Sequence, residues 1–594
     1  LTLSDAALCL CFKEHLKHSE ETPLKTYYTD RQGLPVAIDI TGKEGAHKYT
    51  DNANFFCIGP SGSGKSFHMN SVVRQLLEQN TDVVMVDTGD SYEGICSYFG
   101  GTYITYSKEH PISMNPFKIT KTEYRQNFGE KKNFLKSLIF LIFKGSEMPS
   151  KIEDAIINQV IVEYYDAYFH PFRGFSSEEK DRLRHRLLLE DKKNGEYEKY
   201  GEKVAHRYYQ DFEEHQSDIS TKDYAEGKDD IFSEAEVRHQ VKAKRQVEKL
   251  HALVNDKAAT EGEKVAANRQ LMRIMAEVIE GSYLMRIEQK IEKMEQRRRK
   301  MTVRKLSFNT FYEYALERIP QLMAEKKIAF NIDNFAAILE QFYRGGELES
   351  TLNNDLEQSL FDERFIVFEI DKIKDDPVLF PIVVLIIMDV FLQKMRIKKG
   401  RKALIIEEAW KAIASPTMAE YIKYLYKTVR KFHGIAGVVT QELNDVIDSP
   451  IVKEAIINNS DVKILLDQAK FKDRYDDIAA ILGLTAVQRQ QIFTINALNN
   501  HEGRNYFKEV WICRGQVSDV YGVEEPSECY WAYTTERAEK EALKIYTRHF
   551  GGNIQRAITE IEKDRRQTGI NKYLDFARQV NNHQNIMSLW KSQS

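Results

Sequence analysis

The pattern of hydrophobic and polar residues changes along the chain, and each change marks a different kind of structure. Short apolar runs occur at 54–58 and at Asp82–Asp87 (DVVMVD), with a glycine-rich turn and a helical pattern, Lys65–Glu78, between them. Apolar runs of this length, bounded by turn residues, predict buried strands. Strand, loop, helix and strand in this order predict a βαβ unit and hence a parallel sheet.

From about residue 120 to residue 345 the strand signals stop, and Glu, Lys, Arg, Gln and Ala dominate. Leu284, Ile287, Ile291 and Met294 keep the spacing of one face of an amphipathic helix. The region therefore predicts an all-helical insertion whose apolar stripes pack against one another. The polar, uneven stretch at 210–235 predicts a mobile loop within it.

Strand patterns resume after the helical region. Four apolar runs of strand length follow, at 365–370, 403–406, 435–440 and 462–466. They lack a clean polar alternation, which is typical of a parallel sheet covered on both faces. Residues 508–514 and 529–533 predict late strands, and the last 60 residues or so predict helices. The fold class expected is α/β, with a parallel-rich sheet interrupted by a large all-α insertion.

These changes of pattern divide the chain into five predicted segments: an N-terminal lead (1–34), the first part of the α/β domain (35–118), the helical insertion (119–345), the second part of the α/β domain (346–535) and C-terminal helices (536–594). A chain of 594 residues is long enough for two to four domains. Because the first residue is Leu1 rather than methionine, the sequence is interpreted as part of a longer protein.

Composition narrows the function classes. Hydrophobic residues make up 42% and charged residues 29% of the chain, which is typical of a globular protein, and the counts of 30 Gly and 13 Pro exclude a fibrous or disordered one. With 85 basic and 89 acidic residues, the net charge of −4 does not indicate a broadly basic, nucleic-acid-coating surface. Six cysteines are too few for a disulfide framework and fit a reducing compartment. The longest uncharged apolar run, 378–388, contains Pro381 and is shorter than the roughly 18 residues of a membrane span.

One segment matches the phosphate-loop pattern G-x-x-x-x-G-K-[ST] at every fixed position. Its residues are Gly59, Pro60, Ser61, Gly62, Ser63, Gly64, Lys65 and Ser66. Glycines allow the backbone to aim several N–H groups at phosphate oxygens, and the following helix adds its positive N-terminal end. Lys65 is expected to reach the terminal phosphates of ATP, and the Ser66 hydroxyl is expected to bind Mg²⁺. The segment lies after a predicted strand and before a predicted helix, as this chemistry requires.

A second acidic element is predicted at the end of a later strand. The sequence ALIIEEAW (403–410) is an apolar run that ends in two carboxylates. Phosphate-loop hydrolases need one acid for the magnesium shell and another to orient the attacking water. We assign Glu407 to the metal and Glu408 to the water; the alternative is an exposed Glu-Glu pair at a strand end.

Two further residues are weaker candidates. Gln441 follows the run at 435–440, where an amide can sense the terminal phosphate or simply cap the strand. Arg430 lies in a basic helix end, TVRK. An arginine donated across a subunit interface neutralises transition-state charge, whereas a solvated arginine at a helix C-terminus is the alternative.

Taken in order, GPSGSGKS, DTGDSY (87–92), MNPF (114–117), IIEEAW (405–410), VRKFHG (429–434) and VVTQ (438–441) resemble the large ATPases of type IV secretion and conjugation, in the HerA/FtsK group of hexameric motors. The sequence is most similar to the TraG-type ATPases of conjugative transposons, over nearly the whole chain.

The resemblance implies a RecA-like motor domain carrying an inserted helical domain, a homo-hexamer, and assembly with inner-membrane channel components at the cytoplasmic face of the membrane. The N-terminal domain that usually precedes the motor is expected to be absent from this chain. By the same resemblance Lys65 and Ser66 are the Walker A pair, Glu408 the catalytic acid, Arg430 the arginine finger and Gln441 the phosphate sensor. The family usually has Asp-Glu where this chain has Glu407-Glu408; hydrolysis is expected to survive, because water can absorb the extra methylene.

Three functions follow as hypotheses. The first is an ATPase that powers assembly or operation of a conjugative secretion channel. The second is a DNA-pumping coupling ATPase of the same superfamily, for which the basic run at 297–300 could contact phosphates, although a solvated helix end is favoured. The third is a nucleotide-binding scaffold that hydrolyses little.

Overall fold

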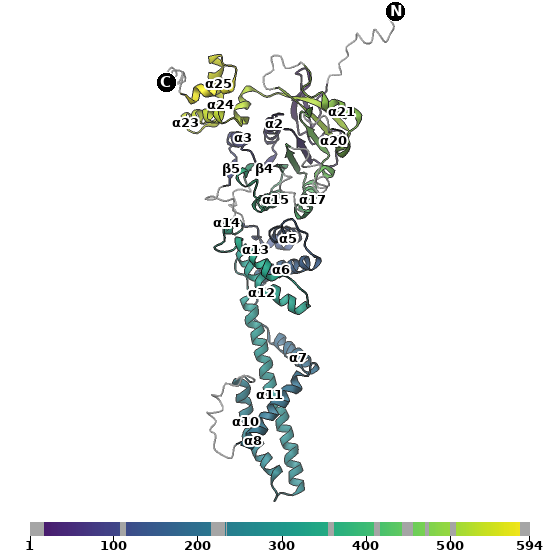
Figure 1. Ribbon diagram of the computed structural model, residues 1–594, viewed down its shortest axis with the longest axis vertical. Coiled ribbons are helices and arrows are strands. Elements are labelled where there is room, and N and C mark those ends of the chain that lie inside the picture. The colour runs from purple at the N-terminus through teal and green to yellow at the C-terminus, as the bar shows by residue number, and fades with distance from the viewer. Residues whose placement is uncertain are drawn as a thin grey trace, which may run out of the picture. The chain divides into compact units, whose positions relative to one another are not determined.

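The computed structural model describes residues 17–106, 115–214, 232, 234–354, 362–408, 416–441, 456–469, 475–498 and 507–582. The chain divides into two compact units. The first comprises Leu1–Val162 and Leu306–Ser594, and the second comprises Glu163–Lys305. Every strand of the described chain belongs to the first unit, where the strands form one eleven-stranded sheet (Figure 1).

The strands follow the order β2-β1-β11-β10-β9-β3-β8-β7-β4-β6-β5 across the sheet. Their bounds are β1 (Thr26–Thr29), β2 (Pro35–Ile38), β3 (Phe55–Ile58), β4 (Asp82–Asp87), β5 (Thr102–Thr105), β6 (Phe365–Glu369), β7 (Lys402–Glu407), β8 (Ile435–Thr440), β9 (Val462–Leu465), β10 (Lys508–Arg514) and β11 (Val517–Val523). From β9 to β5 all neighbours are parallel, whereas β10, β11, β1 and β2 extend the sheet by antiparallel pairs. The expected α/β fold with a parallel-rich sheet is confirmed.

Helices cover both faces of the parallel strands, which explains why these strands are apolar throughout. On one face, side chains of α2 (Lys65–Glu78) and α3 (Glu93–Tyr98) share a core with alternate strand residues such as Cys57 and Met85. On the other face, α15 (Leu379–Ile397) packs on β4 and β7, and α17 (Pro416–Lys431) packs on β8. The apolar run at 378–388 is therefore part of a core helix.

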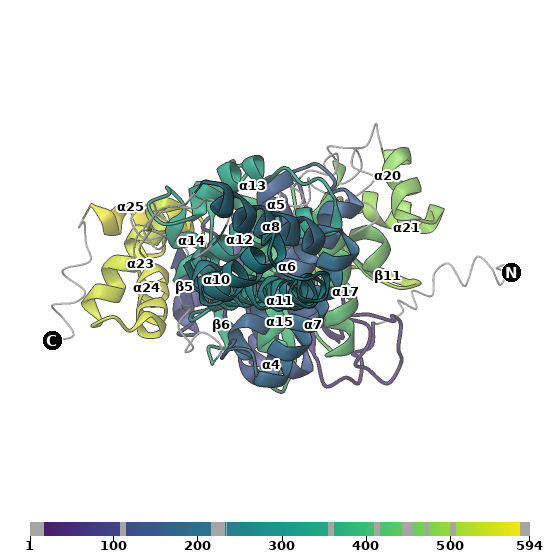
Figure 2. The same ribbon diagram turned by 90° about the horizontal axis from the view of Figure 1, so that it is seen from below.

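The remaining helices of the first unit surround this framework. They are α4 (Lys121–Gln126), α5 (Phe128–Lys144), α12 (Phe308–Lys326), α13 (Ile332–Leu339), α14 (Glu349–Asn353), α20 (Tyr475–Leu482), α21 (Ala486–Phe493), α22 (Ser527–Tyr533), α23 (Arg537–His549), α24 (Ile554–Thr568), α25 (Tyr573–Asn581) and the short 3-10 helices η1 (Glu340–Phe342), η3 (Asp371–Ile373) and η4 (Ile457–Asn459). Figure 2 shows α23, α24 and α25 gathered at the β5 end of the unit, with α20 and α21 at the other end beside β11.

One predicted strand is wrong. Residues 529–533 belong to helix α22, which begins directly after Pro526. Their aromatic and cysteine side chains favour a strand locally. However, Trp531 and Tyr533 are buried in the core that α22 shares with α24 and α25, and Trp531 packs against Tyr573 and Phe576. This packing stabilises the helix and overrides the local preference.

Glu562, a buried acid of α24, stabilises the packing of the C-terminal helices, and its charge depends on pH. Glu562 accepts hydrogen bonds from Arg565 Nη2 at 2.7 Å and from Trp531 Nε1 at 3.1 Å. Burial alone would raise the pKa of Glu562, but the hydrogen bonds from Arg565, Arg566 and Trp531 outweigh it and lower the pKa below the usual 4.5. The stabilisation is therefore complete above pH 4.5 and is lost as the pH falls through the lowered pKa.

We expect Glu562→Gln to destabilise the protein at pH 7 by about 2 kcal/mol, because it removes charged hydrogen bonds from buried arginine and tryptophan groups. We also expect Glu562→Gln to lose less stability than wild type between pH 7 and pH 3, an interval that extends well below pH 4.5. Urea unfolding followed by tryptophan fluorescence at both pH values measures this. Glu560→Gln on the same helix is the matched control, since the side chain of Glu560 is 23% exposed and forms an ion pair with Lys563 at 3.3 Å. Equal pH dependence in wild type and Glu562→Gln would refute the assignment.

The second unit is built from helices, as the sequence predicts. It contains α7 (Ser177–Lys193), α8 (Glu196–Glu214), α10 (Glu234–Asn255) and the 40-residue α11 (Glu261–Lys300), and α6 (Lys151–Phe169) crosses its boundary. Capping boxes begin α7 at Ser176 and α11 at Thr260. Ile287 and Ile291 of the predicted amphipathic face are buried in the core of this unit. Most of the loop predicted at 210–235 lies outside the described residues, while 210–214 form the end of α8.

Among the described residues no helix combines the length and the apolar character that crossing a lipid bilayer requires.

Candidate nucleotide-binding site

Strand register brings most of the predicted site residues to one edge of the sheet. Ile58 of β3 pairs with Thr440 of β8, Val439 of β8 with Glu407 of β7, and Ile406 of β7 with Val86 of β4. Because these four strands are parallel neighbours, the residues that follow them lie side by side. The edge therefore carries the phosphate loop, Gln441, Glu408 and the segment that begins at Asp87. Ligands of open α/β sheets bind at this carboxyl edge.

The phosphate loop, Gly59–Ser66, has a backbone that requires glycine at fixed points. The Gly59 N–H donates to Thr440 O at 3.2 Å, which ties the loop to β8. A Cβ atom at Gly59 would lie 2.7 Å from Ser63 Oγ. Gly64, the N-cap of α2, has a φ of 91°, in the left-handed region that side chains disfavour.

The start of α2 has the properties of an anion site. Its N-cap is Gly64, so no side chain caps the first N–H groups of the helix, and the helix dipole is positive at this end. Ser63 Oγ is buried and has no hydrogen-bond partner among the described residues. Uncapped N–H groups, an unpartnered buried hydroxyl and the Lys65 ammonium fit the phosphates of a nucleotide.

Lys65 connects the loop to the acidic strand end. Its Nζ atom lies 3.4 Å from Oε1 of Glu408, and the two side chains are 6% and 14% exposed. Glu408 has a φ of 49°, and its backbone N–H donates to Val439 O at 2.8 Å. The chain thus leaves β7 in a left-handed turn at Glu408, next to the lysine of the phosphate loop.

Glu407, one residue earlier, is held inside the protein. It is 3% exposed, and Oε1 accepts a hydrogen bond from the Tyr92 hydroxyl at 2.8 Å. Burial raises the pKa of Glu407; the charge of Lys65 and the Tyr92 hydrogen bond oppose this rise. The two adjacent glutamates therefore differ sharply in environment, one buried beside a phenol and one partly exposed beside a lysine.

Asp87 is an acid at this edge that the sequence analysis did not single out. It ends β4, is fully buried, and accepts backbone N–H groups from Gly89 at 3.0 Å and Ser91 at 2.8 Å. Burial, followed by the nearby Glu407 carboxylate, raises the pKa of Asp87. The available signal was the motif DTGDSY, in which an acid at a strand end precedes a Gly-containing turn.

Magnesium fits this group of residues. In nucleotide sites Mg²⁺ takes one or two protein oxygens and completes its shell with phosphates and water. Ser66 and Glu407 lie in the two segments that meet at this edge and offer a hydroxyl and a carboxylate. A cation there would also offset the repulsion between Glu407 and Asp87. The described residues contain no cluster of three or more His, Cys, Asp or Glu side chains that could hold a metal ion.

Arg430 and Gln441 lie at opposite ends of β8. Gln441 is exposed directly after the strand, at the phosphate-loop edge. Arg430 is exposed in the last turn of α17, which leads into the amino-terminal end of the strand. Six strand residues span about 20 Å. Gln441 therefore belongs to the edge that holds Lys65, whereas Arg430 does not.

A second lysine, Lys508, lies beside the phosphate loop. It is the first residue of β10, and a Cβ atom at Gly64 would be 3.2 Å from Lys508 Cγ. Since 443 positions separate Lys508 from Lys65 and no motif marks it, nothing in the sequence predicted this neighbour.

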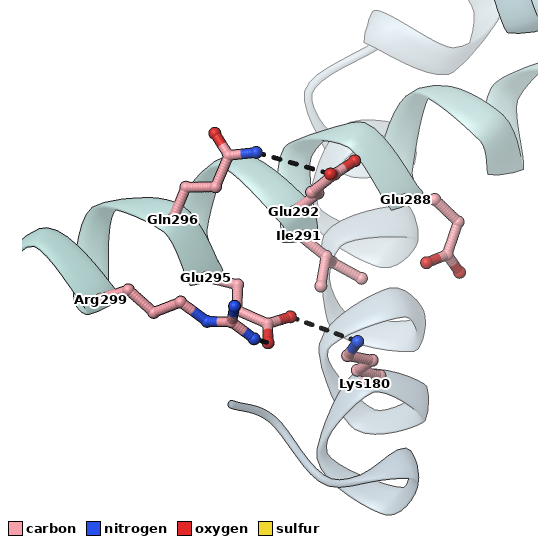
Figure 3. Close-up of a pocket in the computed structure, with 7 residues that line it drawn as sticks. All are labelled: Lys180, Glu288, Ile291, Glu292, Glu295, Gln296 and Arg299. Atoms are coloured by element: carbon pink, nitrogen blue, oxygen red, sulfur yellow. Dashed lines mark hydrogen bonds and ion pairs between the residues drawn. The ribbon is translucent and has the colours of Figure 1, made fainter. Parts of the chain in front are cut away.

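The basic run at 297–300 lies at the end of α11 in the second unit, and two of its arginines, Arg298 and Arg299, have partners there. Arg299 pairs with Glu295 at 2.8 Å, and the same carboxylate pairs with Lys180 of α7 at 3.2 Å (Figure 3). The guanidinium of Arg298 lies 5.2 Å from the ring centre of Phe175. These contacts favour a solvated helix end over a phosphate-binding patch.

Comparison with known proteins supports the resemblance. The profile described as the TraG P-loop domain matches residues 26–212 and 256–565. The type IV secretion system protein virB4 of Bartonella quintana (strain Toulouse) is 26% identical over 149 residues, which is 24% of this chain and 18% of that protein. The chain thus matches less than a fifth of the length of this curated relative.

Two solved structures are similar over most of the chain. VirB4 of Thermoanaerobacter pseudethanolicus has a TM-score of 0.47 at 15% identity and covers 86% of this chain and 98% of its own. The plasmid coupling protein TrwB in complex with ADP and Mg²⁺ has a TM-score of 0.32 at 11% identity and covers 88% of this chain and 92% of its own. Because the family profile matches well over half of its residues, the chain belongs to the TraG P-loop domain family.

Proposed function

We propose that this chain hydrolyses ATP with Mg²⁺ and that the energy drives assembly or substrate transfer of a conjugative type IV secretion system. The observation that carries the proposal is the meeting of the phosphate loop with the acidic end of β7, where Lys65 Nζ and Glu408 Oε1 are 3.4 Å apart. Phosphoanhydride hydrolysis needs a cation that binds the phosphates and a nearby carboxylate that can orient water, and Lys65 and Glu408 supply these two groups.

Each residue at this edge has a distinct role in the proposal. The N–H groups of Gly59–Ser66 bind the phosphates, and Lys65 neutralises their terminal charge. Ser66 and Glu407 hold Mg²⁺, which withdraws charge from the phosphate oxygens. Glu408 orients the attacking water and accepts its proton, and Gln441 contacts the terminal phosphate.

Arg430 completes the site of a neighbouring subunit. Its exposure, and its place about 20 Å from the edge that holds Lys65, support action between subunits rather than within one. The protein therefore functions as a homo-oligomer, a hexamer by family resemblance. It assembles with inner-membrane channel components at the cytoplasmic face. The name of the Bartonella relative supports the secretion role.

Arg430→Ala is expected to lower the ATPase rate about a hundredfold while leaving nucleotide affinity within about twofold of wild type. Mixing tests its role between subunits. The Lys65→Ala subunit keeps Arg430 but has a disabled phosphate loop. The Arg430→Ala subunit keeps the phosphate loop but has no arginine to donate to its neighbour. An equal mixture of the two inactive variants should recover about a quarter of the wild-type activity, if subunits mix at random in a ring. No recovery after confirmed subunit exchange would argue against the trans arginine.

Magnesium-dependent release of phosphate from ATP by the purified chain tests the proposal as a whole. Firm ATP binding without phosphate release at any protein concentration would favour the nucleotide-binding scaffold instead.

A further inference from the structure

The motif DTGDSY (87–92) lies at the site, yet none of the roles assigned above uses it. Its first residue, Asp87, folds the motif into a tight turn, since its carboxylate accepts the N–H groups of Gly89, Ser91 and Tyr92 at 3.0, 2.8 and 3.3 Å. Asp90 within the turn has a φ of 50°. The turn ends at Tyr92, which precedes α3.

The turn is also hydrogen-bonded to α2, the helix that follows the phosphate loop. Asn70 of α2 donates through Nδ2 to Ser66 O at 2.9 Å and to Ser91 O at 3.2 Å, and the Asn70 side chain is fully buried. A shift of the turn would therefore cost hydrogen bonds at both Asp87 and Asn70. The backbone that carries Tyr92 is fixed relative to Ser66.

Tyr92 is the link from this turn to the acidic strand. Its side chain is fully buried, and its hydroxyl donates to Oε1 of Glu407 at 2.8 Å. A phenol O–H is a hydrogen-bond donor and a carboxylate oxygen is an acceptor, so the Tyr92 hydroxyl donates in this pair. One oxygen of Glu407 is thereby occupied, and the rotation of the carboxylate is restricted.

We propose that Tyr92 is a positioning residue, whose hydroxyl fixes Oε1 of Glu407 so that the carboxylate faces the magnesium–nucleotide complex in one orientation. The proposal rests on the proposed function, because it assigns the metal to Glu407. The proposal also accounts for the conformation of DTGDSY. Hydrogen bonds to Asp87 and Asn70 fix the turn, and the turn fixes the position of Tyr92. Tyr92 contacts Glu407 rather than the nucleotide, so we expect its loss to change the nucleotide affinity that depends on Mg²⁺.

The test is the affinity for a fluorescent ATP analogue, measured in EDTA and at increasing Mg²⁺ for wild type, Tyr92→Phe, Glu407→Gln and Tyr103→Phe. Tyr92→Phe keeps the buried ring and removes only the hydroxyl. We expect its affinity in EDTA to stay within about twofold of wild type, while the Mg²⁺ concentration for half-maximal tightening rises about tenfold, as for the loss of a hydrogen bond to a charged group. Tyr103→Phe is the matched control, because its hydroxyl donates to Asp90 at 2.8 Å instead.

The outcomes separate the two proposals. If Mg²⁺ does not raise the affinity of wild type for the ATP analogue, the magnesium site of the proposed function is wrong, and so is the role of Tyr92. If wild type responds to Mg²⁺ and Glu407→Gln does not, but Tyr92→Phe matches wild type, only the role of Tyr92 is wrong. An equal loss in Tyr103→Phe would overturn it as well.

A double variant and a spectroscopic probe cover the case in which Tyr92→Phe folds poorly. In the Glu407→Gln background, Tyr92→Phe should cause no further loss of Mg²⁺ response, since the two residues act as one unit. Fluorotyrosine placed at position 92 keeps the hydroxyl, and its ¹⁹F resonance should shift when Mg²⁺ is added to the nucleotide-bound protein. Additive losses, or a resonance that does not respond, would contradict the proposal.

Discussion

Replacing Lys65 with alanine is expected to abolish ATP hydrolysis and to weaken ATP binding about a hundredfold. Lys65 is the cation of the phosphate loop, and its side chain is 6% exposed at the start of α2. Its removal leaves the terminal phosphate charge without its main counter-charge in a poorly solvated site. It also leaves Glu408 without the ammonium 3.4 Å away. Isothermal titration with ATP, together with a phosphate-release assay, measures both losses.

Lys563→Ala is the control for loss of a lysine, since Lys563 is half-exposed on α24 and forms an ion pair with Glu560. It should bind and hydrolyse ATP as wild type does. Near-normal ATP affinity in a folded Lys65→Ala protein would show that the phosphates bind elsewhere, and the site described above would then be wrong.

Glu408→Gln is expected to separate binding from hydrolysis. The amide keeps the size of the side chain but cannot take a proton from water, so the hydrolysis rate should fall by about a hundredfold or more. ATP affinity should be kept or should increase, because the negative charge next to the phosphates is removed. Single-turnover hydrolysis and equilibrium nucleotide binding, measured on the same preparation, test both statements.

Glu420→Gln provides a matched substitution away from the site, since Glu420 is exposed on α17 and pairs with Lys423 at 3.1 Å. If Glu408→Gln hydrolyses ATP at the wild-type rate while Glu407→Gln does not, the two glutamates have exchanged roles.

Sequence patterns predicted the central elements of the fold because local and global preferences agree there. The bounds of α2 and β4 match the predicted Lys65–Glu78 and Asp82–Asp87, since glycine-rich and polar turns end each apolar run. The antiparallel strands β1 and β11 were not predicted. Their short, mixed sequences TYYT and VSDVYGV become strands by pairing with each other and with neighbouring strands, and such long-range pairing leaves no periodic signal.

In the site, too, the residues of a continuous motif could be predicted from the sequence, whereas contacts between distant segments could not. The phosphate loop is one continuous motif, so its residues could be named from the sequence. The pairing of Tyr92 with Glu407 joins positions 315 apart, and only the register of β4 with β7 reveals it. The predicted domain boundaries and the roles of all the predicted site residues, those of the phosphate loop and both glutamates included, stay predictions.

The most direct measurement is the rate of Mg²⁺-dependent ATP hydrolysis per subunit as a function of protein concentration. If Arg430 completes a neighbouring site, the rate per subunit should rise with concentration, in step with oligomer formation measured by light scattering, and should vanish in EDTA. A substantial rate that is the same at concentrations where the protein is monomeric would contradict a site completed by a neighbouring subunit.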